Sequence, residues 1–145
     1  MKKILALDIA TKTGWKTSTA SGIWNLKPNR GESDGMRVVR FKAKVNEMIK
    51  IESINLIAYE RVAGKQNAAI SVISEMVGQL KLISIEQGID LACYSAKEIK
   101  KFATGNGNAS KDLMVKTAIA QGYNPIDDNE ADAIFIYNLT IKDIG

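Results

Sequence analysis

The sequence predicts an α/β fold in which a mixed five-stranded sheet, with three antiparallel and two parallel strands, is flanked by helices. Five short runs that are apolar, or alternate between apolar and polar residues, are typical of strands; they cover residues 3–9, 15–19, 23–26, 54–59 and 89–94. Long stretches with helical periodicity follow the third and fourth strands, at residues 36–51 and 67–87. This alternation places the chain in the α/β class.

The order of these elements predicts how the strands connect. Tight turns at residues 11–14 and 21–22 indicate that the first three strands form an antiparallel meander. The fourth strand follows a helical crossover, which places it parallel to an earlier strand. We therefore expect the fourth strand to lie beside residues 3–9, in the middle of the sheet.

The predicted helices have recognisable caps and faces. The helix over 36–51 is expected to have a basic outer side and an apolar face formed by Met36, Val39, Ala43, Met48 and Ile49. Ser95 and Ser110 are predicted N-caps of two shorter helices, which run to residues near 102 and 121. The last helix is expected from residue 128 or 129 to about 139.

A chain of 145 residues that is 46% hydrophobic can bury one core, so we expect a single domain over residues 1–145. No apolar run approaches the roughly 20 residues that span a bilayer. The short apolar run at the start is interrupted by Asp8, unlike a signal peptide. We therefore expect a cytoplasmic protein with no membrane partner. The net charge of +4 permits a polyanionic partner without requiring one.

The chain contains one cysteine and no histidine. A disulfide within one chain is excluded, which agrees with a reducing compartment. Catalytic triads and zinc sites that use histidine are excluded as well. A catalytic metal would have to be bound by carboxylate and carbonyl oxygens, and such donors favour Mg²⁺ or Mn²⁺.

Three acids are predicted to meet at one edge of the sheet. Asp8 and Glu60 lie near the ends of two strands that we expect to be parallel neighbours, and Asp132 lies early in the last helix. Ala131 and Ala133 would let that helix approach the sheet closely. Grouped carboxylates raise one another's pKa, and two divalent ions about 4 Å apart relieve this repulsion and act on a phosphodiester. Each acid alone is better interpreted as a turn residue or a helix cap, so the metal-site interpretation depends on the three acids together.

Four segments resemble motifs of the RuvC family, in the ribonuclease H-like superfamily, and its phage-encoded members in particular. They occur in the family's order and cover residues 4–15, 58–62, 98–111 and 129–133. The resemblance implies a ribonuclease H-like fold and a crossover junction endodeoxyribonuclease of DNA recombination and repair. Such an enzyme is a homodimer that resolves Holliday junctions by nicking opposing strands symmetrically with Mg²⁺ or Mn²⁺. For a phage-encoded protein, the compartment is the host cytoplasm.

The resemblance also implies roles for individual acids. Asp8, Glu60 and Asp132 correspond to the catalytic ligands of two metal ions. The position of the family's usual fourth ligand is occupied by Asn129, which brings no charge, so its neighbour Asp128 is the alternative. Both residues can share the helix face of Asp132, because they stand three and four positions before it.

Lys100 and Lys111 correspond to positions near the scissile phosphate, and the resemblance implies that they are catalytic. DNA-backbone contacts are expected from these two lysines and from Lys97, Lys101, Arg61 and Lys65. Taken without the family, lysines beside a glycine loop are ordinary solvated surface. Ala63 replaces an aromatic wedge of bacterial members, which predicts low sequence preference and action on other branched DNA.

The helix over 67–87 has apolar residues beyond one stripe, which is explained either by burial in the monomer's core or by pairing with a symmetry mate. Alternatives to junction resolution also stay open. One is another ribonuclease H-like nuclease acting on RNA or DNA ends. Another is a junction-binding protein with a weakened metal site, which Asn129 favours. A sugar-kinase or actin-like nucleotide binder is disfavoured, because it needs a second such domain.

Overall fold

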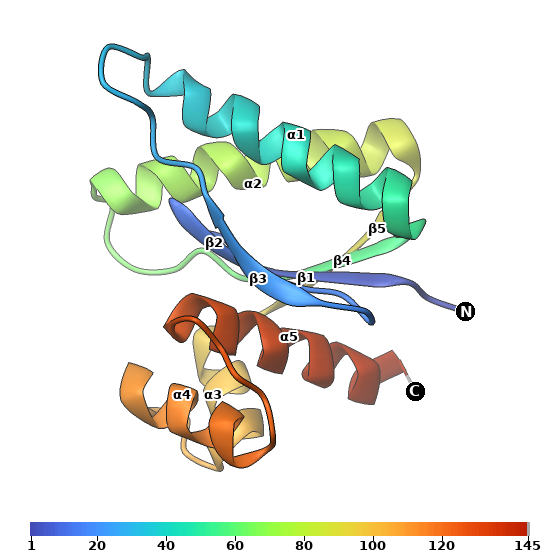
Figure 1. The fold of residues 1–145 in the computed structure, drawn as a ribbon, viewed down its shortest axis with the longest axis vertical. Coiled ribbons are helices and arrows are strands. Elements are labelled where there is room, and N and C mark those ends of the chain that lie inside the picture. Colours follow the sequence, from blue (N-terminus) through green and yellow to red (C-terminus); the bar gives the residue numbers. More distant parts are fainter. Residues whose placement is uncertain (145) are drawn as a thin grey trace.

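The computed structural model describes residues 1–144 and places a five-stranded sheet between two layers of helices (Figure 1). The strands lie in the order β3-β2-β1-β4-β5. They are β1 (Ile4–Asp8), β2 (Lys12–Lys16), β3 (Ser21–Asn25), β4 (Leu56–Glu60) and β5 (Asp90–Tyr94). The helices are α1 (Gly35–Glu52), α2 (Ala68–Gln87), α3 (Ala96–Thr104), α4 (Lys111–Ala120) and α5 (Asp128–Ile144).

The strand pairing confirms the predicted mixed sheet. Strands β1, β2 and β3 pair antiparallel, whereas β4 pairs parallel with both β1 and β5. The central strand β1 therefore points in the same direction as β3 and β4. The carboxyl ends of these three strands consequently lie at one edge of the sheet, which is the edge that the predicted site requires.

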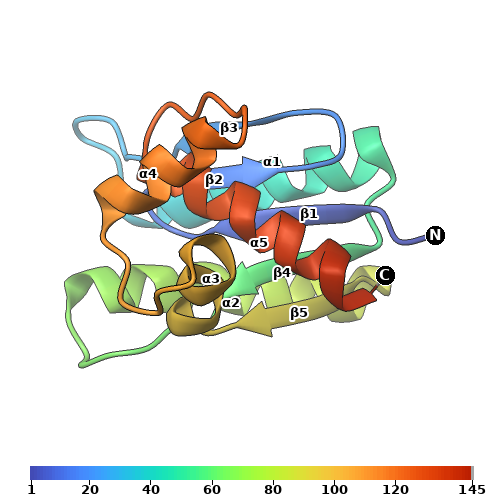
Figure 2. The same ribbon diagram turned by 90° about the horizontal axis from the view of Figure 1, so that it is seen from below.

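The two faces of the sheet carry different layers. Helices α1 and α2 cover one face, and α3, α4 and α5 cover the other (Figure 2). Alternation along β1 explains this, since successive side chains of a strand point to opposite faces. Leu5 and Leu7 belong to the core beneath α1 and α2, while Ala6, together with Ala58 of β4, belongs to the core beneath α5. The small alanines leave α5 close to the sheet.

Strand β2 begins earlier than predicted. Its predicted range was 15–19, with a turn over 11–14, but residues 12–16 form the strand and the turn lies at residues 17–20. The expected turn at 21–22 is also wrong, because these residues are part of β3. The physical reason is Gly14: a Cβ there would lie 1.9 Å from the Asn129 carbonyl oxygen. This glycine therefore makes room for α5 rather than for a turn.

The buried face of α1 also differs from the prediction. Phe41 and Val45 are fully buried, whereas Val39 is 56% exposed and Ala43 is exposed. Burying Phe41 and Val45 removes more apolar area from water than burying Val39 and Ala43 would. Compared with the prediction, α1 is rotated about its axis so that Phe41 and Val45 face the core. Its basic side chains therefore lie beside this buried stripe and not on the opposite side of the helix.

Helix α2 corrects the expectation about apolar runs. Its mean hydropathy of 1.4 over 18 residues makes it long and apolar enough, by length and composition, to cross a membrane. In this fold it packs on the sheet through one stripe, formed by Met76, Val77, Leu80 and Ile83. Only 22% of that window is buried, so α2 keeps an apolar face outside the core of the chain.

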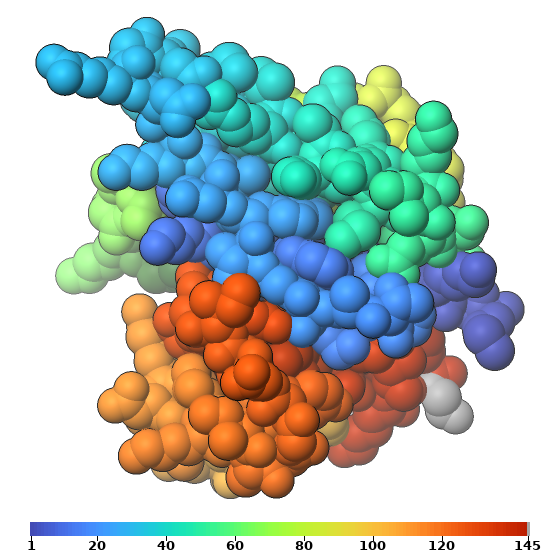
Figure 3. Space-filling model, viewed as in Figure 1, coloured from blue at the N-terminus to red at the C-terminus, as the bar shows by residue number. Residues whose placement is uncertain are grey.

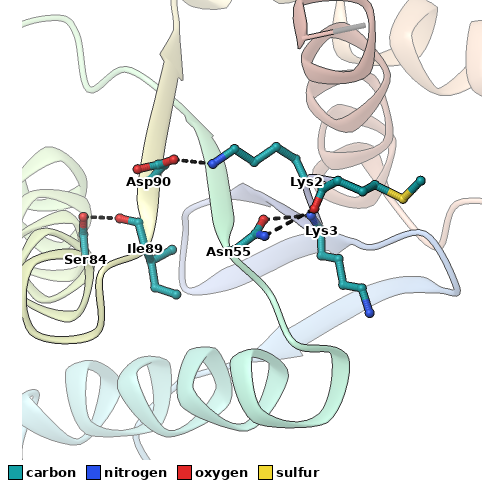
Figure 4. Close-up of polar contacts among 7 residues, drawn as sticks. Lys2, Lys3, Asn55, Ser84, Ile89 and Asp90 are labelled. Carbon is teal, nitrogen blue, oxygen red and sulfur yellow. Dashed lines mark hydrogen bonds and ion pairs between the residues drawn. The ribbon is translucent and has the colours of Figure 1, made fainter.

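The end of the sheet that is remote from the predicted site is tied by polar contacts (Figure 4). The Lys3 backbone N–H donates to the Asn55 side-chain oxygen at 2.8 Å, and Asn55 N–H donates back to the Lys3 carbonyl. Lys2 pairs with Asp90, at the start of β5. These contacts hold the amino ends of β1, β4 and β5 in register.

The predicted caps are confirmed. Ser95 and Glu98 form a reciprocal capping box at the start of α3, and Ser110 accepts from Leu113 N–H at the start of α4. Helix α3 extends two residues beyond its predicted end. Helix α5 begins at Asp128 as predicted but continues to Ile144, five residues beyond the predicted end.

Candidate active site

Asp8 and Glu60 are the last residues of two neighbouring parallel strands. Register pairs Leu7 with Tyr59, so the two acids follow side by side at the same edge of the sheet. Both line one small cavity of about 70 Å³, whose wall includes Arg61 and Ala63. Both residues are half-buried. The sheet topology alone therefore brings these two carboxylates together.

Asp132 joins them from α5, one turn into the helix. Two features let α5 approach β1 and β2: Ala131 and Ala133 are fully buried, and Gly14 lies opposite Asp8 in the β1–β2 register. The Asn129 backbone sits directly over Gly14. Had position 14 carried a side chain, α5 would have been displaced outward, and Asp132 with it.

The three acids influence one another electrostatically. The pKa of Asp8 is raised well above its ordinary value by burial first, and then by the charges of Asp132, Glu60, Asp128 and Asp127. Burial, Glu60 and Asp128 raise the pKa of Asp132 to about 7. Burial also raises the pKa of Glu60. The three charges together are therefore unfavourable without a compensating cation.

Two lysines oppose this repulsion. Lys100, on α3, lowers the pKa of both Glu60 and Asp132. Lys111, at the start of α4, lowers the pKa of Asp132 and pairs with Asp128, its Nζ lying 3.9 Å from Oδ2. The structure thus places both predicted catalytic lysines beside the acids, on two helices that the Gly105–Gly107 loop connects.

The other predicted DNA-contacting residues lie further out. Lys97 lies along the loop after α3, where a Cβ on Gly107 would come 2.7 Å from its Cγ. Lys101 and Lys65 are exposed, and Arg61 is exposed at the mouth of the small cavity. Of these four, only Arg61 lines the same cavity as Asp8 and Glu60.

The start of α5 contains two acids to which the sequence analysis gave no role. Asp127 accepts from Glu130 N–H at 3.0 Å and so caps the helix, while also raising the pKa of Asp8. Glu130 is buried and accepts from Ser21 Oγ at 2.6 Å and Ile126 N–H at 2.8 Å. An acid followed three positions later by Glu is the sequence signal that would have indicated this cap.

The donor set suits a hard divalent cation, because it consists of oxygens and its carboxylates gain from added positive charge. Within residues 1–144, no three acidic or cysteine side chains stand in a ready metal-holding arrangement. The acids are therefore grouped electrostatically without forming a complete ligand shell. Their role as ligands remains a prediction, as does the choice between Asn129 and Asp128 as the fourth.

Cavity size does not mark this site. The largest cavity described, about 990 Å³, lies at the opposite end of the sheet, between the start of β1 and the ends of α1 and α5. The small acidic cavity is distinguished instead by its charge. A small, charged site of this kind is suited to the backbone of an extended polyanion rather than to an enclosed small molecule.

Known proteins with similar sequences and folds are members of one family. The family described as crossover junction endodeoxyribonuclease RuvC matches residues 9–138. A RuvC of Brachyspira hyodysenteriae is 35% identical over 95 residues, which are 64% of this chain and 59% of that protein. A RuvC of Corynebacterium glutamicum is 30% identical over 102 residues, 68% of this chain and 46% of that protein. The chain thus matches only about half of these curated relatives' length.

The fold comparison agrees. The structure described as T. thermophilus RuvC in complex with Holliday junction substrate superposes with a TM-score of 0.74, covering 94% of this chain and 90% of that one at 20% identity. At this identity the likeness shows the fold, which confirms the predicted ribonuclease H-like architecture. Because the family match extends from the residue after β1 into α5, this chain belongs to the RuvC family of crossover junction endodeoxyribonucleases.

Proposed function

We propose that this chain is a structure-selective endonuclease that resolves Holliday junctions, and cuts other branched DNA, by nicking opposing strands symmetrically. The observation that carries the proposal is the convergence of Asp8, Glu60 and Asp132 beside Lys100 and Lys111 at one sheet edge. Acids that repel one another, with cations beside them, suit a bound metal and a phosphodiester rather than structural stabilisation.

Asp8, Glu60 and Asp132 would hold Mg²⁺, or Mn²⁺ in its place, with two ions per site and Asn129 or Asp128 as a further ligand. When bound, these ions supply positive charge that activates water and stabilises the departing oxygen. Family membership supports this assignment, since RuvC nucleases are metal-dependent. The raised pKa values of the three acids also support metal binding, because a bound cation can replace the protons that these carboxylates otherwise hold.

Lys100 and Lys111 would contact the scissile phosphate, because both lysines, on α3 and α4, lie close enough to the acids to lower the pKa of Asp132. Lys97, Lys101, Arg61 and Lys65 would contact backbone phosphates further from the cut. Such contacts position DNA without recognising its sequence. Ala63 is exposed beside Glu60 and has no ring to stack on a base, which supports low sequence preference.

A homodimer would place two such sites on a junction with two-fold symmetry. Helix α2 supports this, because it presents Leu82 (46% exposed) and Ile85 (84% exposed). Gly78 belongs to the same stripe and has open space where a Cβ would stand. Residues 78, 82 and 85 share one helix face, and this face is well suited to a second copy of α2.

The decisive experiment compares wild type with Asp8→Asn on a synthetic four-way junction, a linear duplex and an RNA–DNA hybrid. We expect Mg²⁺-dependent paired nicks in the junction, a loss of at least about a hundredfold in Asp8→Asn, and retained junction binding. Mn²⁺ should raise the melting temperature of wild type, because a metal ion that binds only the folded state stabilises that state. It should not raise the melting temperature of Asp8→Asn, which lacks one of the proposed ligands. Glu47→Gln, at an exposed position of α1, is the control and should resemble wild type.

Other outcomes separate the alternatives. Cleavage of the hybrid or of duplex ends in preference to the junction would favour a different ribonuclease H-like nuclease. Junction binding with no cleavage by wild type in either metal would favour a binding protein. Repeating the assay on junctions of varied core sequence tests the expectation from Ala63, which cleavage confined to one tetranucleotide would contradict.

A further inference from the structure

The positive charge of this chain is concentrated in one segment. Residues 27–44 contain six Lys and Arg against two Asp and Glu, whereas the remaining residues contain fourteen of each. The net charge of +4 therefore belongs to this segment, which comprises the loop after β3 and the first part of α1. None of the predicted DNA-contacting residues lies in it.

The segment emerges at the edge of the sheet that carries the acids. Strand β3 points in the same direction as β1 and β4, so the chain leaves β3 at the end where Asp8 and Glu60 lie. The loop over 27–34 then projects from the body of the molecule at that end (Figures 1 and 3). It forms an extension beside the active site, on the far side of β2 from β4.

The loop is held in a defined shape. Glu32 accepts from Asn29 N–H at 2.6 Å and from Arg40 Nη2 at 2.7 Å, which ties the loop to α1. Arg37, Arg40 and Lys44 recur at intervals of three and four residues, so they share one side of the helix, and contact with Glu32 shows that this side faces the loop. We call Lys27, Arg30, Arg37, Arg40 and Lys44 the basic flank.

Most of this charge has no ion-pair partner among residues 1–144. Within this described range, Arg40 is the one residue of the basic flank that forms an ion pair, and its partner is Glu32. Lys27, Arg30 and Lys44 are exposed. Arg37 Nε and Arg40 Nη1 are buried N–H donors without an acceptor in the described structure. An exposed concentration of cations on a preformed loop is favourable for a polyanion, because little ordering is needed on binding.

We propose that the basic flank binds the phosphate backbone of a duplex arm as it leaves the active site. This inference rests on the proposed function, because it takes the substrate of that site to be branched DNA. The part of the basic flank on α1, residues 37–44, is about 12 Å long, which matches about three to four base pairs of duplex at 3.4 Å each. The contacts would hold an arm without recognising its sequence.

The test removes three exposed charges together, in Lys27→Gln/Arg30→Gln/Lys44→Gln. A matched control, Lys3→Gln/Lys50→Gln/Lys142→Gln, removes the same net charge from exposed lysines at the opposite end of the molecule. Junction affinity is measured against salt concentration in an Asp8→Asn background, which prevents cleavage. Single-turnover cleavage at saturating protein is measured with Asp8 intact, and circular dichroism checks the fold.

We expect the flank variant to bind at least about tenfold more weakly at low salt, and its log–log salt slope to fall by about 2 to 3, since each phosphate contact contributes about 0.9. Its saturated cleavage rate should stay within about twofold of wild type, because the acids and Lys100 are untouched. A salt slope equal to that of the control triple would overturn the proposal. If wild type neither binds nor cuts junctions, the proposed function fails first, which is a distinguishable result.

Discussion

Asp132 shows most clearly that the charged acids of the site destabilise the folded state. Its pKa is raised to about 7, first by burial and then by Glu60 and Asp128. A carboxyl group with a raised pKa is more stable protonated in the folded state, so its ionisation destabilises the fold. Functional sites commonly carry such groups, whose stabilisation comes from the ligand. Asp8 and Glu60 act in the same direction.

Asp132→Asn should therefore stabilise the metal-free protein above neutral pH. The folded pKa lies above the unfolded value, so the free energy of unfolding of wild type falls as pH rises from about 4 to about 7. The variant lacks this loss. We expect Asp132→Asn to be more stable than wild type by about 1 to 2 kcal/mol at pH 8 and to differ little from it at pH 4. The difference at pH 8 is smaller than the pKa shift alone implies, because solvent screens a half-buried charge.

Urea denaturation with a chelator present, at both pH values, measures this difference. Glu47→Gln, on the exposed side of α1, is the control and should change little at either pH. An Asp132→Asn variant that is less stable than wild type at pH 8 would contradict the expectation and indicate a structural role for the carboxylate.

Lys100 and Lys111 are expected to affect cleavage more than binding. Their charges oppose the raised pKa of Asp132, and both would face the reacting phosphate. Lys100→Gln and Lys111→Gln should each reduce single-turnover cleavage by about tenfold to a hundredfold, with junction affinity changed by less than about threefold. Lys116→Gln, exposed on α4, is the control. Full activity in both lysine variants would remove these residues from the site.

At the scale of elements, the site depends on how closely α5 approaches the sheet. Strands β1 and β4 already place Asp8 and Glu60 side by side, but Asp132 reaches them only because α5 lies against β1 and β2. Gly14 is the contact that permits this, since its missing side chain is replaced by the Asn129 backbone. The buried Glu130, bonded to Ser21, holds the start of α5 against β3.

Gly14→Ala should consequently separate the metal ligands. The added Cβ would lie 1.9 Å from a backbone oxygen, which neither group can avoid without moving α5. We expect a loss of about 3 kcal/mol in the free energy of unfolding and cleavage reduced at least as much as in Asp8→Asn. Gly35→Ala, whose Cβ would make only a 3.4 Å contact, is the control. A Gly14→Ala variant with wild-type stability would show that α5 adjusts freely.

At the scale of the whole molecule, the two outer layers have different surfaces. The layer of α3, α4 and α5 completes the site with lysines, while α2 keeps an apolar stripe outside the chain's own core. Residues of that stripe lie well away from the acids along α2, so pairing of two copies through it would leave both sites accessible. This geometry fits two coordinated nicks on one junction.

Ile85→Arg should convert the proposed dimer to a monomer. Ile85 is 84% exposed, so a charge there is harmless to the isolated chain and unfavourable in an apolar interface. We expect a halved mass in sedimentation velocity, unchanged circular dichroism, and single nicks in place of paired ones. Ile51→Arg changes an equally apolar residue on α1, 68% exposed, and should leave the mass unchanged. A dimer that survives Ile85→Arg would place the interface elsewhere.

The sequence by itself determined what depends on local signals. Apolar runs and crossovers predicted the strand order, Ser95 and Ser110 predicted two helix starts, and the positions of Asp8 and Glu60 at strand ends predicted their meeting. These features need only periodicity, capping chemistry and the rule that parallel neighbours end at the same edge.

Tertiary structure alone decided what depends on contacts between distant residues. The position of β2 depends on Gly14, which lies beneath the Asn129 backbone. Glu130 accepts a hydrogen bond from Ser21, which is 109 positions away in the sequence. Phe41 is buried in place of Val39 because only one face of α1 can pack on the sheet, and the face with Phe41 buries more apolar area. Such outcomes are set by which side chains fill a shared volume, and no short window of sequence contains both partners.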